Sequence, residues 1–271
     1  MKFTTVCFAG LMVLISMQYT NGEMFSVDIT SDELVLIDPT SGNVCLVGSL
    51  QYDASDIDLA MYQGRLFGLN TQAGIRVDLL EINTASGAVM WYQQVSLNDN
   101  PVVHAEGLAA DTEGLIIGFH QSGDLWLSSV MGNLGLNGAI SNPVDYGGSV
   151  DFDGLTEQND IFYFSDCELP TSATEVAFYS LNSLPHEILR YPLNQHVSND
   201  LVVVGSHLFS LSDQMGELWS TNIETAEFED SISLSRPGTY FGLAIPEPLS
   251  TTFLAMGALS LLAYTWRRKR R

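Results

Sequence analysis

The residues most able to do chemistry in this sequence are acids that stand just before a repeated leucine. Asp56 and Asp58 precede the first such leucine, Glu106 the second, and Asp151 and Asp153 the third. Carboxylate oxygens are the ligands that Ca²⁺ prefers, so acids converging from separate repeats could hold one hard cation. The alternative is that they cap turns, since neither Asp-x-Asp pair follows the EF-hand pattern. No other cofactor is expected.

Catalytic signatures are absent from the sequence. It contains no G-x-S-x-G, H-E-x-x-H, P-loop or C-x-x-C motif, and its five His residues lack metal-ligand spacing. We therefore expect a protein that is not an enzyme. Trp126 and Trp219 follow the same Leu in two repeats, which favours a packing role over a sugar-stacking platform. Trp91 and Tyr92 are the better candidates for an exposed aromatic pair.

Two elements that recur along the chain must position these residues. The segment LVLIDPTSGNV from Leu34 recurs 45 residues later as LLEINTASGAV from Leu79, and a weaker copy starts at Asp124. Each unit reads as four short strands divided by Gly, Asn and Asp turns, and a period of about 40–50 residues is typical of propeller blades. The second element carries leucines spaced by 49, 47, 46 and 42 residues, which are Leu59, Leu108, Leu155, Leu201 and Leu243.

The ends of the repeat region predict how the ring closes. The last unit stops after its first strand, FGLA from Phe241, while MFSVD (24–28) resembles the second strand of a unit. If these segments pair, the two ends share one blade, and we predict an all-β domain with a five-bladed β-propeller-like fold. The longer stretch 168–185 could instead contribute a sixth blade. An open β-sandwich or a solenoid is the alternative, because repeats alone do not prove closure.

The region between the two ends of the chain is strongly acidic. Residues 23–245 hold 31 of the 32 acids and only four of the ten bases, so four positive against 31 negative charges leave −27. Such a surface repels phosphate backbones, which excludes nucleic acid as a partner. Cys7 belongs to the expected leader, and the sequence cannot show whether the remaining Cys45 and Cys167 pair.

Both ends of the chain carry membrane-directed signals. Lys2, twelve apolar residues over 6–17 and a small residue at Gly22 predict a signal peptide over 1–22. Residues 249–266 are uncharged and apolar, and as a helix of about 27 Å they could just cross a bilayer core. Clustered cations stay on the cytoplasmic side, so the body, 23–245, is expected outside. The cations are Arg267, Arg268, Lys269, Arg270 and Arg271.

The order of these C-terminal features resembles the PEP-CTERM sorting signal of Gram-negative bacteria. The triplet Pro246, Glu247 and Pro248 precedes the apolar span and the basic cluster, so 246–271 would form the sorting segment. The resemblance implies that a membrane enzyme, an exosortase, recognises the triplet and cuts near it. Ile245 stands where Val is the commoner neighbour. The span and cations alone would also suit a plain single-span anchor.

We expect an exported, non-enzymatic protein with a structural or binding role. It would pass through the inner membrane to the envelope, the cell surface or the extracellular matrix. The expected partners are an exosortase, the membrane and an extracellular polysaccharide. Two alternatives stay open: a secreted propeller hydrolase or lyase with a metal in its central channel, and a plain membrane-anchored module that binds glycans or proteins.

Overall fold

The computed structural model describes parts of the acidic body and neither end of the sequence. The described residues are 22–72, 75–97, 100–103, 105, 107–110, 114–118, 125–128, 136–140, 154–158, 161–166, 174–180, 189–193, 198–212, 216–225 and 227–246. All regular secondary structure in these ranges is β-strand. In this part of the chain no helix has the length and apolar character needed to span a membrane. The predicted signal peptide, apart from Gly22, and the predicted span lie outside it.

The strands form five antiparallel sheets of four strands, with one further two-stranded sheet of β8 (Ser96–Leu97) and β9 (Asn100–Pro101). The first, which we call the terminal sheet, has the order β22 (Tyr240–Ala244), β1 (Met24–Asp28), β2 (Glu33–Ile37) and β3 (Val44–Ser49). The second sheet contains β4 (Ile57–Tyr62), β5 (Arg65–Gln72), β6 (Arg76–Ile82) and β7 (Val89–Gln94). The third sheet contains β10 (Gly107–Ala110), β11 (Leu115–Gly118), β12 (Leu125–Ser128) and β13 (Leu136–Ile140).

The last two sheets follow the same plan. The fourth sheet contains β14 (Gly154–Gln158), β15 (Ile161–Asp166), β16 (Thr174–Ser180) and β17 (Leu189–Leu193). The fifth sheet contains β18 (Ser198–Val204), β19 (His207–Ser212), β20 (Glu217–Asn222) and β21 (Glu227–Ser233). The all-β prediction is therefore confirmed.

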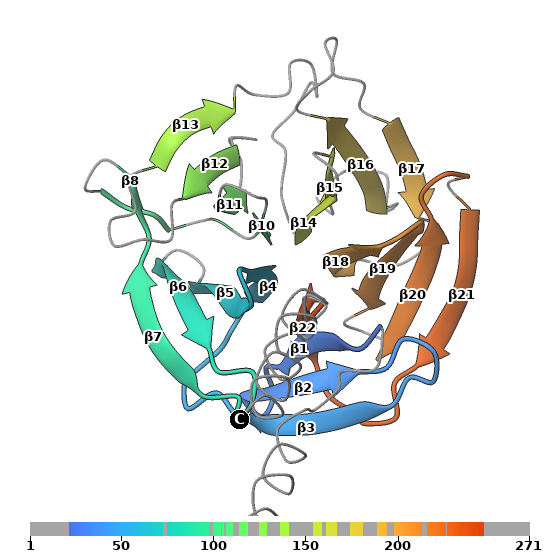
Figure 1. The fold of residues 1–271 in the computed structure, drawn as a ribbon, viewed down its shortest axis with the longest axis horizontal. Helices are drawn as coiled ribbons and strands as arrows, with labels where there is room; N and C mark the ends of the chain where they lie inside the picture. The colour runs from blue at the N-terminus through green and yellow to red at the C-terminus, as the bar shows by residue number, and fades with distance from the viewer. Residues whose placement is uncertain are drawn as a thin grey trace, which may run out of the picture.

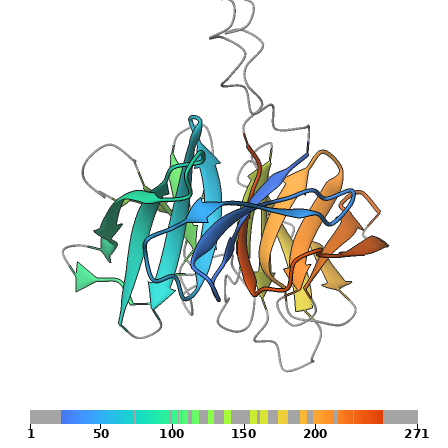
Figure 2. The same ribbon diagram turned by 90° about the horizontal axis from the view of Figure 1, so that it is seen from below.

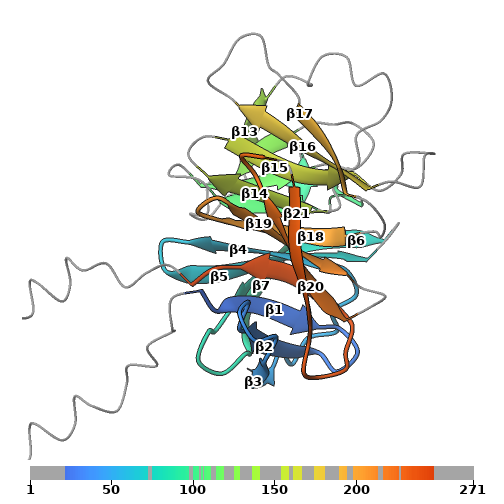
Figure 3. The ribbon, with the colours of Figure 1, turned by 90° about the vertical axis from the view of Figure 1, so that its right-hand side faces the viewer.

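The five sheets surround a common centre (Figure 1). Their innermost strands are β22, β4, β10, β14 and β18, and each contacts the next around the ring, with β18 returning to β22. The outermost strands, such as β7 and β21, lie at the rim (Figure 1). Figure 3, turned a quarter about the vertical, shows β14 above β18 and β4, with β1 below them. The arrangement is propeller-like.

The ring closes where the two ends of the body meet. β1 pairs antiparallel with β22 through Phe25 with Ala244 and Val27 with Phe241, and the two strands lie side by side at the centre of Figure 2. The Ser26 hydroxyl also donates to the Phe241 carbonyl at 3.0 Å. The predicted sharing of one sheet by the two ends is confirmed. Pairing removes two open strand edges that would otherwise leave backbone groups exposed.

The predicted hairpin element is also confirmed in the first two sheets, and the fifth sheet has a related turn. Asp38 and Asn83 directly follow the third strand of their sheets, and Asn222 ends the third strand of the fifth sheet. The side-chain oxygen of each accepts the amide two residues later at 2.9 Å. In the first two of these Asx turns, the Gly42 and Gly87 amides also donate to the Asp38 and Asn83 carbonyls at 2.8 Å. Gly42 and Gly87 complete the first two turns with φ of 71° and 77°. Of the third predicted copy, 124–134, the structure describes only β12, and the turn that follows it lies outside the described residues.

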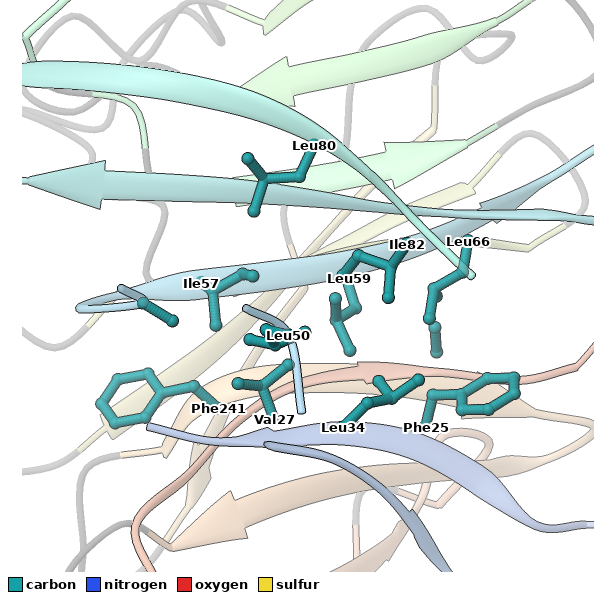
Figure 4. Close-up of a cluster of buried hydrophobic side chains, with 12 residues drawn as sticks. Phe25, Val27, Leu34, Leu50, Ile57, Leu59, Leu66, Leu80, Ile82 and Phe241 are labelled. Carbon is teal, nitrogen blue, oxygen red and sulfur yellow. The ribbon is translucent and has the colours of Figure 1, made fainter. Parts of the chain in front are cut away.

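Both faces of the terminal sheet are buried against neighbours. Phe25, Val27 and Leu34 pack against Ile57 and residues of the second sheet (Figure 4). The opposite face packs against Leu211 and Leu218 of the fifth sheet. β1 is covered on both sides, which explains why all five residues of MFSVD are buried rather than alternating, including the polar Ser26 and Asp28.

Candidate functional site

The residue before the repeated leucine lies at the start of each innermost strand, close to the ring centre. It is Asp58 in β4, Gly107 in β10, Gly154 in β14, Asp200 in β18 and Gly242 in β22. Two acids and three glycines thus share one structural position. The space there is small, because a Cβ added to Gly242, whose φ is 68°, would lie 2.5 Å from the Leu59 Cγ. Such a contact excludes a side chain on Gly242.

The Asp58 carboxylate joins three sheets through backbone hydrogen bonds. Its Oδ2 accepts the Leu108 amide at 2.7 Å and the Leu155 amide at 3.3 Å, and its Oδ1 accepts the Leu59 amide at 2.8 Å. The side chain is buried. Both carboxylate oxygens are therefore engaged by backbone donors at the start of β4, β10 and β14. This is a cap shared among separate sheets.

Burial raises the pKa of Asp58 well above its usual range, and the nearby Asp56 acts in the same direction, while the amides of Leu108, Leu59 and Leu155 act against them. The folded state thus binds a proton that the unfolded chain, with an Asp pKa of about 3.9, releases earlier. Asp58 therefore contributes most to stability in acid, and this contribution is lost as pH rises through its folded-state pKa.

The raised pKa of Asp58 predicts a pH dependence of stability that can be measured. Asp58→Asn, which cannot titrate, is expected to lose less stability than the wild type between pH 4 and pH 7. The wild-type advantage in unfolding free energy should therefore fall as pH rises, at up to about 1.4 kcal/mol per pH unit. Urea unfolding of both proteins across this range measures it. An advantage that grows with pH would show that the ionised carboxylate is the favoured form.

Beyond Asp58 the innermost strands line a partly open axial cavity of about 250 Å³. Its lining is mostly Leu, Ala, Met and Val, with Thr156 and Glu157 as polar members and Pro246 beside the end of β22. Ligand pockets usually measure about 300–1,000 Å³ and converge several polar groups, so this cavity is small and poorly equipped for catalysis.

The structure describes only part of the predicted cation site. Asp56 and Asp58 are described, whereas Glu106, Asp151 and Asp153 lie outside the described residues. Among the residues that are described, no group of three or more His, Cys, Asp or Glu could hold a metal ion. The calcium site therefore stays a prediction.

Of the predicted sorting residues and cysteines, too, the structure describes only some. Pro246 is described and buried, immediately after β22 and Ile245. Glu247, Pro248 and the cations from Arg267 to Arg271 lie outside. Cys45 is an exposed free thiol on β3, and Cys167 lies outside.

A second polar cluster, which sequence reasoning missed, lies where the terminal and second sheets meet. The Tyr52 hydroxyl, from the segment that joins the two sheets, donates to Asp78 Oδ2, and Arg76 Nε lies 2.9 Å from the same oxygen. Burial and this bond raise the pKa of Tyr52, which keeps the hydroxyl a donor. The Tyr92 ring lies 5.6 Å from that of Tyr52. We call Tyr52, Arg76, Asp78, Tyr92 and Gln94 the seam cluster.

Comparison with known proteins supports the fold and no more. No protein-family model and no curated protein matches the chain. Among solved structures, a chain of a nidogen/laminin complex is 10% identical with a TM-score of 0.54, covering 83% of this chain and 98% of that one. A glutaminyl cyclase from Myxococcus xanthus is 19% identical with a TM-score of 0.47, covering 67% and 72%. The first likeness shows a shared propeller-like fold, whereas the second is too weak to support a conclusion.

Proposed function

We propose that this chain is an exported five-bladed β-propeller protein, sorted through its C-terminal segment, with a structural or binding role. The observation that carries the proposal is the order Pro246-Glu247-Pro248, an uncharged apolar stretch and five cations. Such a stretch is stable across a bilayer, and its basic end stays in the cytoplasm. The triplet at the outer end is where an exosortase would act, and the body would reach the envelope, cell surface or extracellular matrix.

The geometry of the body's ends supports a single attachment. Because Phe25 pairs with Ala244 in antiparallel register, β1 begins where β22 ends. Both ends of the body therefore lie at one end of the ring, and Pro246 follows directly. A body of this kind can be held by one segment while its opposite end faces away from the membrane.

The sheet count favours five blades over six. The stretch 168–185, where a sixth blade could hide, supplies β16 to the fourth sheet. Each four-stranded sheet then corresponds to one blade, with the terminal sheet shared by the two ends.

A structural or binding role fits the centre of the ring. Asp58, at the start of β4, is engaged by three backbone amides. The axial cavity is small and mostly apolar. General acid–base chemistry needs a carboxyl that can reach a substrate proton, and Asp58 is committed elsewhere.

The sorting proposal predicts the mass and location of the mature chain. In an exosortase-bearing host, the wild type should lose its signal peptide and everything beyond about Pro248. Glu247→Ala combined with Pro248→Ala should accumulate as a membrane-bound chain that keeps its tail. Cell fractionation and intact-mass measurement check both results.

A matched control is Pro237→Ala, an exposed proline outside the triplet, which should be processed as the wild type is. A wild-type chain that retains Arg271 in the mature envelope would favour a plain anchor. Full-length chain dissolved in the cytosol would refute export altogether.

A further inference from the structure

The seam cluster presents an aromatic ring to solvent beside polar groups. Tyr92 is 57% exposed on β7, the exposed outer strand of the second sheet. The Tyr52 ring lies against it at an interplanar angle of 57°, and the Tyr52 hydroxyl is fixed by Asp78. The exposed ring is therefore held in place before any partner arrives, which lowers the entropy cost of binding.

The strand register places the polar groups on the same face as this ring. Tyr92 pairs with Leu80, and Gln94 pairs with Asp78, so the four side chains share one side of the second sheet. Arg76, two residues before Asp78, lies on that side as well, and its side chain is 41% exposed. An exposed aromatic ring is thus followed by an amide and a guanidinium.

The buried part of the cluster orients the exposed part. Arg76 Nε is buried 2.9 Å from Asp78 Oδ2, the oxygen that also accepts the Tyr52 hydroxyl. Asp78 is itself buried, so it positions Tyr52 and Arg76 and does not face a ligand.

The charge of the site restricts the partner. β7 reads VMWYQQ and contains no charged residue, although the body carries −27. An anionic polymer would be repelled by the body, and so would a second copy with the same charge. A neutral partner meets neither penalty. By contrast β21 carries Glu227, Glu229 and Asp230 around its own exposed aromatic, Phe228.

From these observations we infer that the seam cluster binds a neutral polysaccharide. The apolar C–H face of a pyranose ring stacks on Tyr92, and its hydroxyl groups bond to Gln94 and Arg76. This inference deepens the proposed binding role by naming its ligand class, and it depends on that role but not on how the tail is processed.

Affinity electrophoresis of the full chain in detergent tests it, with a 1,3-glucan, a 1,6-glucan and a galactomannan in separate gels and alginate as the anionic comparison. We expect retardation by at least one neutral polymer and none by alginate. Tyr92→Ala should raise the apparent dissociation constant about tenfold, whereas Tyr92→Phe, which keeps the ring, should stay near the wild type.

Two variants of exposed aromatics provide matched controls. Phe228→Ala removes a ring that is 58% exposed on another sheet, and Trp91→Ala removes one that is 42% exposed on the opposite face of β7. Both should bind as the wild type does. Equal loss in either control, or no retardation by any neutral polymer, would overturn the inference. So would a wild-type dimer that becomes a monomer in Tyr92→Ala, since the site would then bind a second copy.

The two proposals can fail separately. A chain that is exported and cut, yet retained by no neutral polymer, would refute the sugar site alone. A chain that binds a neutral polymer through Tyr92 but keeps its tail and never leaves the cytosol would refute the sorting proposal alone.

Discussion

Replacing Phe241 and Leu243 together by Ala is expected to lower the free energy of unfolding by about 5–10 kcal/mol. The two side chains lie two residues apart on β22, yet they enter different cores. Phe241 packs toward the second sheet with Ile57 and Leu59, and Leu243 packs toward the fifth sheet with Leu211. Because the cores are separate, the two losses should nearly add.

The expected loss is comparable to the whole stability of a domain, about 5–15 kcal/mol, so the double variant should be largely unfolded at 25 °C. Urea titration of the body, residues 23–246, followed by tryptophan fluorescence, measures it. Phe228→Ala, an exposed aromatic on the rim strand β21, serves as a control and should lose under about 1 kcal/mol. A double variant that unfolds with the wild-type midpoint would show that ring closure through β22 contributes little.

The repetition in the sequence was sufficient to predict the sheets and their closure. A spacing of 45 residues between LVLIDPTSGNV and LLEINTASGAV predicts equivalent hairpins, and the structure has them at β2–β3 and β6–β7. The unfinished last unit at Phe241 predicts a partner at the other end, which is β1. These features repeat because each sheet solves the same packing problem, and repetition can be seen without knowing the fold.

The chemistry of the centre could not be predicted in the same way. Asp58 was visible as an acid before a repeated leucine, but its partners, the amides of Leu108 and Leu155, are 50 and 97 residues away. Backbone donors carry no residue-type signal, so the sequence could not distinguish a cap across three sheets from a calcium ligand.

The seam cluster was hidden for a related reason. Trp91 and Tyr92 were predicted as an exposed aromatic pair, and both are exposed, at 42% and 57%. Adjacent strand residues nevertheless point to opposite faces, so they cannot form one platform. The partner of Tyr92 is Tyr52, from the segment joining two sheets, which no periodic pattern connects to β7.

Replacing Asp58 by Ala is expected to destabilise the body by about 2–6 kcal/mol. The substitution leaves the buried amides of Leu108 and Leu155 without their acceptor, and each buried unsatisfied donor costs about 1–3 kcal/mol. Because those amides start β10 and β14, the loss weakens the junction of three sheets rather than one strand. Urea unfolding at pH 5 measures the change.

Two comparisons separate the shared cap from other effects of the substitution. Asp53→Ala removes an exposed acid five residues earlier and should change stability by less than about 0.5 kcal/mol. Asp58→Asn keeps one oxygen that can accept the Leu108 and Leu155 amides, so it should lose less than Asp58→Ala. If calcium instead stabilised the wild type and not Asp58→Ala, with equal stability in chelator, the acid would act as a ligand. If the wild type, Asp58→Ala and Asp58→Asn were equally stable without metal, the Asp58 cap would contribute nothing to stability. The contacts between sheets would then depend on their apolar side chains alone.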